Sequence, residues 1–400
     1  DGDANNASVS GTCGDPTEVS TVTQGTPAIT TLASASIALG VGALSDQATV
    51  TGVVNPVGPQ TVTFRLFGPA DAMCAGVPVF TSTVPLVGGV ALSAGFAPSD
   101  VGVYRWVATY DGDVNNASVS GSCGDPTEVS TVTQGTPAIT TLASPPIALG
   151  VGALSDQATV TGVVNPVGPQ TVTFRLFGPA DATCAAVPVF TSTVPLVGGV
   201  ALSAGFAPSD VGVYRWVATY DGDANNVSVS GTCGDPTEIS TVTQATPAIT
   251  TLASPAIVVG SGQLSDLATV TGRVNPIGAQ TVTFRLYGVA DATCAGSPVF
   301  TSAVALTGAT AESASFTPAV AGTYRWVATY EGDANNAAVS GTCGDPTETA
   351  TAAAAPMALP PTLPPTLPPT GAALDAVIAL ALGVVVVGAL MVRVTRRRIA

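Results

Sequence analysis

The acidic loop Asp111-Gly-Asp113-Val-Asn115-Asn116 presents side-chain oxygens at its first, third and fifth positions. Oxygen ligands with this spacing open calcium-binding loops. The candidate calcium ligands of the first two such loops are Asp111, Asp113, Asn115, Asp221, Asp223 and Asn225, and Glu331, Asp333 and Asn335 are their equivalents in a third loop. Asp125 or Glu128 would complete the calcium shell. The glycine at position 6 and the glutamate at position 12 of an EF-hand are missing. Because Gly, Asp and Asn also favour turns between strands, a calcium loop and a structural turn both stay open.

The basic residues restrict the other kinds of chemistry. The chain has no histidine, and its 11 basic residues are all arginine. This excludes histidine triads, histidine metal sites, Lys-phosphate loops and lysine isopeptide cross-links from these residues. The net charge of −15 argues against a nucleic-acid partner, whose phosphates need a basic surface. We therefore predict neither enzymatic activity nor nucleic-acid binding, and no cofactor other than the calcium considered above.

The seven cysteines are separated by alternating gaps of 61 and 49 residues. Pairing across the shorter gap joins Cys74 to Cys123, Cys184 to Cys233 and Cys294 to Cys343. Pairing across the longer gap would leave Cys343 alone, so we favour the shorter pairing and expect the partner of Cys13 to precede Asp1. Such bridges indicate an oxidising exterior. Free thiols are the alternative, whereas a zinc site is disfavoured because no C-x-x-C pair exists.

The cysteines and the acidic loops recur with a period of 110 residues, which is typical of tandem domains. Residues 1–110 and 111–220 differ only at Val114, Ser122, Pro145, Pro146, Thr183 and Ala186. We expect repeats at 25–134, 135–244 and 245–350, preceded by the tail of a truncated repeat at 1–24 and followed by a proline-rich spacer at 351–371 and an anchor at 372–400. A secretion signal is expected further upstream.

Each repeat contains about seven short segments with strand character. The segment 61–67 places Val62, Phe64 and Leu66 on one face and polar residues on the other, as a half-buried strand requires. The other predicted strands of the first repeat are 29–33, 48–54, 79–84, 90–96, 103–110 and 128–132. Seven strands in about 110 residues predict an all-β chain of immunoglobulin-like sandwiches.

One motif strengthens this interpretation. The run Asp100-Val-Gly-Val-Tyr104-Arg-Trp106 resembles the D-x-G-x-Y-x-C run of immunoglobulin domains, whose tyrosine forms a hydrogen-bonded corner. Trp106 occupies the position of the core cysteine in that family. We therefore predict that Trp106, Trp216 and Trp326 are core residues. The third repeat has Val320 in place of the aspartate, so the aspartate is not required for the corner.

The C-terminal region has the composition of a membrane anchor. Residues 376–392 contain no charge and no proline, which is near the lower limit of about 17 residues needed to cross a bilayer. The basic tail that follows consists of Arg393, Arg396, Arg397 and Arg398. Because basic residues are retained on the cytoplasmic side, the repeats are predicted to lie outside the cell.

Leu367-Pro368-Pro369-Thr370-Gly371 precedes this span. A motif LPxTG, a hydrophobic span and a basic tail resemble the C-termini of sortase-anchored surface proteins of Gram-positive bacteria. The resemblance implies that a sortase thiolate attacks the carbonyl of Thr370, releases Gly371 and the residues after it, and transfers the threonine to an amine of peptidoglycan. LPPT also occurs at 359–362 and 363–366, but neither copy is followed by glycine. A proline-rich linker before an ordinary single-span anchor is the alternative.

These observations predict a protein of the cell surface, single-pass before sorting and covalently bound to the wall afterwards. Its expected partners are a sortase, peptidoglycan and, through residues 376–392, the membrane. Our first functional hypothesis is a structural stalk that projects an upstream module. The alternative is an adhesin whose repeats bind glycans or proteins of host or partner cells, because repeated weak sites give avidity.

Overall fold

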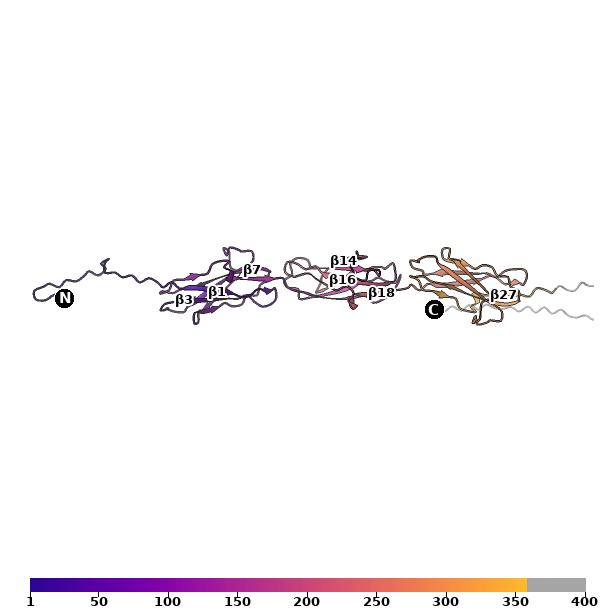
Figure 1. Ribbon diagram of the computed structural model, residues 1–400, viewed down its shortest axis with the longest axis horizontal. Coiled ribbons are helices and arrows are strands. Elements are labelled where there is room, and N and C mark those ends of the chain that lie inside the picture. The colour runs from indigo at the N-terminus through magenta and orange to yellow at the C-terminus, as the bar shows by residue number, and fades with distance from the viewer. Residues whose placement is uncertain (358–400) are drawn as a thin grey trace, which may run out of the picture. The chain divides into compact units, whose positions relative to one another are not determined.

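The computed structural model describes residues 1–357. They contain three tandem β-rich repeats with a period of about 110 residues, and each repeat forms two sheets (Figure 1). The segment 1–24 forms no strand or helix. The predicted sorting motif, membrane span and basic tail lie outside the described residues. Within residues 1–357, no helix has the length and apolar character that a membrane crossing requires.

The first repeat has one sheet of three strands and one of six. The smaller sheet has the order β1, β3, β6, formed by Ala28–Ala33, Asp46–Thr51 and Val90–Leu92. The larger sheet has the order β2, β9, β7, β4, β5, with β8 paired to β7. Its strands are β2 Ile37–Ala38, β4 Thr61–Phe67, β5 Phe80–Pro85, β7 Gly102–Tyr110, β8 Val119–Ser120 and β9 Val129–Thr133, and the 3-10 helix η1 is Pro126–Glu128.

The other two repeats have the same topology. The second comprises β10 Ala138–Ala143, β11 Ile147–Ala148, β12 Asp156–Thr161, β13 Thr171–Phe177, β14 Phe190–Pro195, β15 Val200–Leu202, β16 Gly212–Tyr220, β17 Val229–Ser230, η2 Pro236–Glu238 and β18 Ile239–Thr243. The third comprises β19 Ala248–Ala253, β20 Ile257–Val258, β21 Asp266–Thr271, β22 Thr281–Tyr287, β23 Phe300–Ala305, β24 Thr310–Glu312, β25 Gly322–Tyr330, β26 Val339–Ser340, η3 Pro346–Glu348 and β27 Thr349–Ala353.

The strands form where the sequence alternates between apolar and polar residues. In β4 the side chains of Val62, Phe64 and Leu66 are buried, as predicted, because successive residues of a strand face opposite sides of the sheet. Other strands differ from the prediction at their ends. The strand predicted at 48–54 ends at Thr51, because Gly52 takes a positive φ of 77° that breaks the extended conformation. The two-residue strands β2 and β8 were too short to be predicted.

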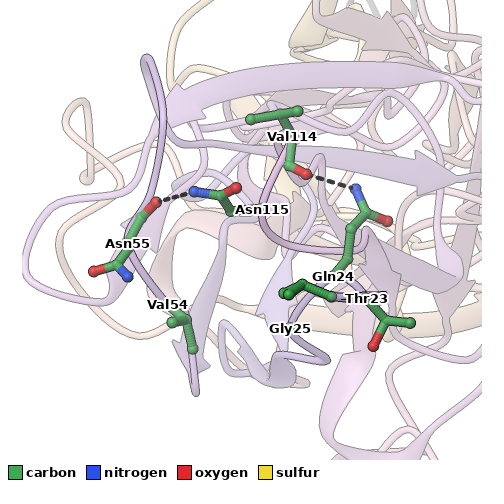
Figure 2. A pocket seen from close by; sticks show the side chains of 8 residues that line it. Thr23, Gln24, Gly25, Val54, Asn55, Val114 and Asn115 are labelled. Carbon is green, nitrogen blue, oxygen red and sulfur yellow. Dashed lines mark hydrogen bonds between the residues drawn. The ribbon is translucent and has the colours of Figure 1, made fainter. Parts of the chain in front are cut away.

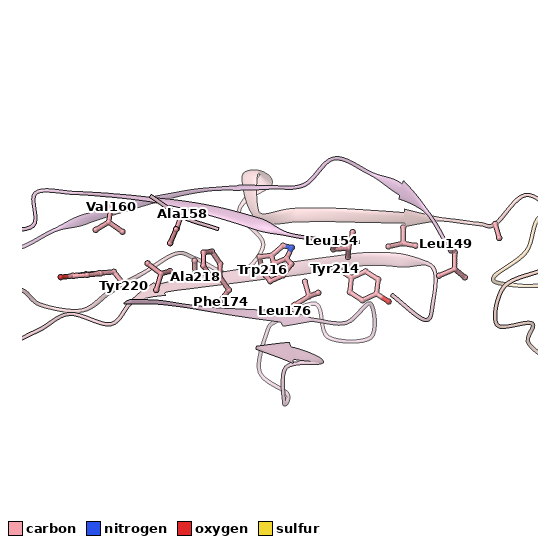
Figure 3. Packing of buried hydrophobic residues seen from close by; sticks show 14 residues of the cluster. Leu149, Leu154, Ala158, Val160, Phe174, Leu176, Tyr214, Trp216, Ala218 and Tyr220 are labelled. Atoms are coloured by element: carbon pink, nitrogen blue, oxygen red, sulfur yellow. The ribbon is translucent and has the colours of Figure 1, made fainter. Parts of the chain in front are cut away.

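The two sheets pack face to face around a tryptophan. The prediction that Trp106, Trp216 and Trp326 are core residues is confirmed, since all three are 0% exposed. In the second repeat, Ala158 and Val160 of the smaller sheet face Phe174 and Trp216 of the larger one (Figure 3). The rings of Phe174 and Trp216 meet edge to face, with centroids 6.4 Å apart. This is a favourable geometry for aromatic pairs.

A tyrosine hydrogen bond fixes the start of each long central strand. The hydroxyl of Tyr104 donates to the carbonyl oxygen of Asp100 at 3.0 Å, and Tyr324 makes the same bond to Val320 at 2.9 Å. Because the acceptor is a backbone oxygen, the aspartate side chain is dispensable, as the sequence indicates. Gly102 has a φ of 135°, and a Cβ there would lie 2.6 Å from Cβ of Pro69, so only glycine fits.

Candidate functional site: the acidic loops and the junctions between repeats

The acidic loops connect the long central strand of each repeat to the short strand after it. In the first loop, Oδ1 of Asp113 accepts the backbone N–H groups of Asn115 at 2.7 Å and Asn116 at 3.1 Å. Its Oδ2 accepts the side-chain amide of Asn116 at 3.0 Å. Desolvation raises the pKa of Asp113, but these hydrogen bonds outweigh it and lower the pKa below its usual value. Asp113 therefore holds the turn together as an ionised acceptor.

The other candidate calcium ligands of this loop point to different partners. Oδ2 of Asp111 accepts the hydroxyls of Thr61 at 2.6 Å and Thr63 at 3.1 Å. Asn115 donates its amide to the carbonyl oxygen of Asn55 at 2.8 Å. Asp125 caps η1 by accepting the N–H of Thr127. In residues 1–357, no three His, Cys, Asp or Glu side chains are grouped closely enough to hold a metal ion. Calcium binding by the loops stays a prediction.

At each of the two junctions between repeats, one buried asparagine hydrogen-bonds to the repeat before it. Oδ1 of Asn225, in the loop of the second repeat, accepts the backbone N–H of Val101 at 3.2 Å. Its Nδ2 lies 3.3 Å from the carbonyl oxygen of Ser99, to which it donates, and 2.9 Å from that of Asn165. The same contacts at the next junction join Asn335 to Val211, Ser209 and Asn275. Each junction is therefore built from the same set of hydrogen bonds.

An apolar contact accompanies these hydrogen bonds. Val164 of the second repeat packs against the core of the first. A Cβ added at Gly40 would lie only 2.8 Å from a methyl carbon of Val164, so the glycine makes room for the valine. Gly150 and Val274 repeat this arrangement, with a distance of 2.7 Å. Each junction thus combines the apolar contact of a valine, Val164 or Val274, with the hydrogen bonds of an asparagine, Asn225 or Asn335.

The first repeat shows the same loop without a neighbour. Asn225 and Asn335 are 2% and 1% exposed, whereas Asn115 is exposed. The sequence identified Asn115 and Asn225 only as candidate calcium ligands. The recurrence of the Asn-Asn pair in each loop indicated that these residues have a role. The contact of Asn225 to the preceding repeat joins residues more than 120 positions apart, so it cannot be inferred from local spacing.

Asn225→Ala should loosen the first junction. It removes the acceptor of the Val101 N–H and one donor to the Ser99 carbonyl, and each buried group left unpaired costs about 1–3 kcal/mol. The Val101 amide should then exchange about tenfold faster or more, since about 1.4 kcal/mol corresponds to a factor of ten. The measurement is hydrogen exchange by NMR, with only the first repeat isotopically labelled because the repeats are nearly identical.

Asn115→Ala is the matched control for this experiment. It removes the equivalent bond within a repeat, from Asn115 to Asn55, but no bond across a junction. It should leave the exchange of the Val101 amide unchanged. Equal acceleration in both variants would contradict the role of Asn225 at the junction.

Each repeat also contains one disulfide. The bonds join Cys74 to Cys123, Cys184 to Cys233 and Cys294 to Cys343, with Cα atoms 5.9 to 6.0 Å apart. These are the pairs across the shorter gap. Cys13 is free and exposed. Disulfides are typical of extracellular proteins.

A pair of buried acids lies between the sheets of each repeat, and the sequence did not reveal it. Asp46 and Glu128 are both 0% exposed. Oε1 of Glu128 accepts the hydroxyl of Thr31, whereas its Oε2 and both carboxyl oxygens of Asp46 have no hydrogen-bond partner of normal geometry in the described part of the chain. Desolvation, followed by the charge of Glu128, raises the pKa of Asp46 to about 7. The equivalents Asp156 and Asp266 have the same raised pKa of about 7.

A polar hollow lies beside each buried glutamate. In the second repeat its volume is about 350 Å³. Its polar lining consists of Thr140, Thr141, Ser230, Thr232, Asp235, Thr237 and Glu238. The first and third repeats have equivalent hollows. Hydroxyl and carboxylate groups of this kind can hydrogen-bond the hydroxyls of a sugar.

No protein-family model matches this chain, and no curated protein sequence matches it. Among solved structures, the chain is similar to one described as "Crystal structure of Putative membrane anchored protein from Corynebacterium diphtheriae". The two are 12% identical, and the match covers 84% of this chain and 93% of the other with a TM-score of 0.25. The similarity is distant.

Proposed function

We propose that this chain is a cell-surface stalk of tandem immunoglobulin-like domains, anchored to the wall by a sortase, and that its repeats have no catalytic activity. The two packed sheets, the tyrosine hydrogen bond to a residue four positions upstream and the central tryptophan support the immunoglobulin-like assignment. The disulfides support a location outside the cell.

The observation that carries the proposal of a stalk is the repetition of one junction. Asn225 and Asn335 make the same contacts to the repeat before them. A spacer needs an interface that can be repeated without change, because each added domain then extends the chain in the same way. The asparagine hydrogen bonds and the valine contact at each junction restrict bending between neighbouring domains.

The proposed anchoring step involves residues outside the described part of the chain. The sortase thiolate attacks the carbonyl carbon of Thr370, the bond to Gly371 breaks, and the glycine amine leaves with the membrane segment. An amine of peptidoglycan then takes the threonine acyl group and releases the thiolate. The resulting amide bond would hold the repeats on the wall.

Leu367→Ala should prevent this transfer. When the chain is secreted by a Gram-positive host with a sortase, the share released by a peptidoglycan hydrolase should fall about tenfold or more, the loss expected when a recognition contact worth about 1.4 kcal/mol or more is removed. The protein should accumulate in the membrane fraction. Western blots of the two fractions give the measurement.

The chain provides its own control in the second LPPT copy. Leu363→Ala changes the same residue type four positions earlier, where no glycine follows the threonine. It should leave wall attachment unchanged. Equal attachment of the parent chain and Leu367→Ala would refute sortase anchoring at this motif.

A second candidate function is adhesion, favoured by the polar hollow that recurs in all three repeats. Three equivalent weak sites for an extracellular glycan or protein would act together through avidity. Residues 135–350 immobilised on beads should then capture partner cells, and Thr141→Val with Thr251→Val should abolish the capture. A stalk alone would leave such beads bare.

A further inference from the structure

An open hollow of about 450 Å³ lies at the end of the first repeat where the chain enters β1. Figure 2 shows its lining, in which Asn115 donates to Asn55 and Gln24 donates to Val114. The complete lining is Val22, Thr23, Gln24, Gly25, Val54, Asn55, Val114 and Asn115.

The corresponding surfaces of the second and third repeats are covered. Val54 is 53% exposed, whereas its equivalents Val164 and Val274 are half-buried against the repeats before them. Asn115 is exposed in the same way, whereas Asn225 is buried. The residues are the same at most positions, with Ala224 and Ala334 in place of Val114 and Ala245 in place of Gly25, so the main difference between the hollow and the junctions is the missing neighbour.

The covered surfaces show which chemistry fits the hollow. The occupant offers a backbone carbonyl and, two residues later, a backbone N–H, as Ser99 and Val101 do for Asn225. It also offers a glycine that admits a valine side chain, as Gly40 does for Val164. Asn115 and Val54 are placed to receive these groups, because Asn115 makes the same bond to Asn55 as Asn225 makes to Asn165.

We propose that this hollow is the docking site for a further repeat of the same kind, joined to the chain ahead of the first repeat and completed by residues 1–24. Those residues differ from 111–134 only at Ala4 and Thr12. They therefore contain the sequence of two strands of a repeat, together with Cys13 at the position of Cys123. The proposed docking site is an interface between repeats and does not depend on wall anchoring, so an experiment can refute one proposal without refuting the other.

The test extends the full chain by a copy of residues 25–110 fused ahead of Asp1. Folding of the added repeat is followed by the thiol of Cys13, which should disappear as it pairs with the copy of Cys74. Docking is followed by hydrogen exchange at the added valine that corresponds to Val101, with the added repeat alone isotopically labelled. Its amide should exchange about tenfold more slowly than in a chain that also carries Asn115→Ala, since about 1.4 kcal/mol corresponds to a factor of ten.

Val114→Ala is the control, because Ala224 and Ala334 occupy this position in the covered surfaces. It should retain the slow exchange. Equal exchange with and without Asn115→Ala, after the thiol has been consumed, would overturn the proposal, as would a thiol that stays free. A dimer of the unextended chain that Asn115→Ala abolishes would assign the hollow to a second copy and contradict the proposed occupant.

Discussion

The repeats should be less stable at pH 8 than at pH 5. Asp46, Asp156 and Asp266 each have a pKa of about 7 in the folded protein, against an ordinary value of 3.8. Between these values the folded chain keeps protons that the unfolded chain releases. The stabilisation is therefore complete below about pH 4 and is lost as the pH rises through about 7. Each unit of pKa corresponds to about 1.4 kcal/mol, which gives at most about 4 kcal/mol per repeat over the whole range, of which roughly 3 kcal/mol, for about two units, is lost between pH 5 and pH 8.

Other carboxylates do not obscure this effect. The pKa values of Asp71, Asp113 and Asp125 are lowered in the folded state, mainly by hydrogen bonds from the backbone and from neighbouring side chains. Their contribution is present at pH values above the ordinary value and is lost only as the pH falls through the lowered values. Between pH 5 and 8 they are ionised in both states. Glu128 has a raised pKa and acts in the same direction as Asp46.

Urea unfolding of the chain at pH 5 and pH 8 measures the effect. The triple substitution Asp46→Asn, Asp156→Asn and Asp266→Asn should reduce the pH dependence to the part that Glu128 and its equivalents contribute, because a neutral amide replaces the aspartate that titrates. The control is Asp210→Asn, which removes an exposed carboxylate and should retain the difference between the two pH values. A parent chain that is equally stable at both values would contradict the raised pKa of the buried acids.

Loss of a disulfide should have an effect of similar size. Cys184 and Cys233 are 49 residues apart, and a bridge that closes a loop of this length contributes about 4 kcal/mol in the chain-entropy model. Replacing both with serine should lower the melting temperature of the second repeat by about 15–30 °C, given about 4–8 °C per kcal/mol for a domain of this size. Calorimetry of the full chain should show one of the three repeats unfolding early.

Cys13→Ser is the control for this experiment. Cys13 is the free cysteine of the described residues, so the substitution removes a thiol of the same kind without opening a bridge. Its melting profile should match that of the parent. If the double substitution leaves the second repeat as stable as the other two, the bridge is dispensable and the core alone sustains the fold.

The sequence predicted the features that depend on neighbouring residues. Alternation in 61–67 predicted the two faces of β4, and the recurring tryptophans predicted the centre of the core. Because the third repeat has Val320 where the first two have an aspartate, the sequence predicted a tyrosine corner that does not need the aspartate side chain. In the structure the hydroxyl of Tyr324 donates to the backbone oxygen of Val320. These inferences succeeded because a period of two residues fixes which side chains face the core.

The roles of several polar residues were decided by the tertiary structure alone. Asp46 is the first residue of a strand and looks like an exposed acid in the sequence, but the second sheet covers it and leaves Glu128 as its charged neighbour.

Asn115 and Asn225 lie in local sequences that differ only at Val114 against Ala224 and at Ala117 against Val227, yet one asparagine is exposed and the other hydrogen-bonds across a junction. The sequence alone therefore determined the repeat, its longer strands and its core. Which acids lose contact with water and which asparagines join two repeats depends on segments about 80 to 125 residues away in the chain, which only folding brings into contact.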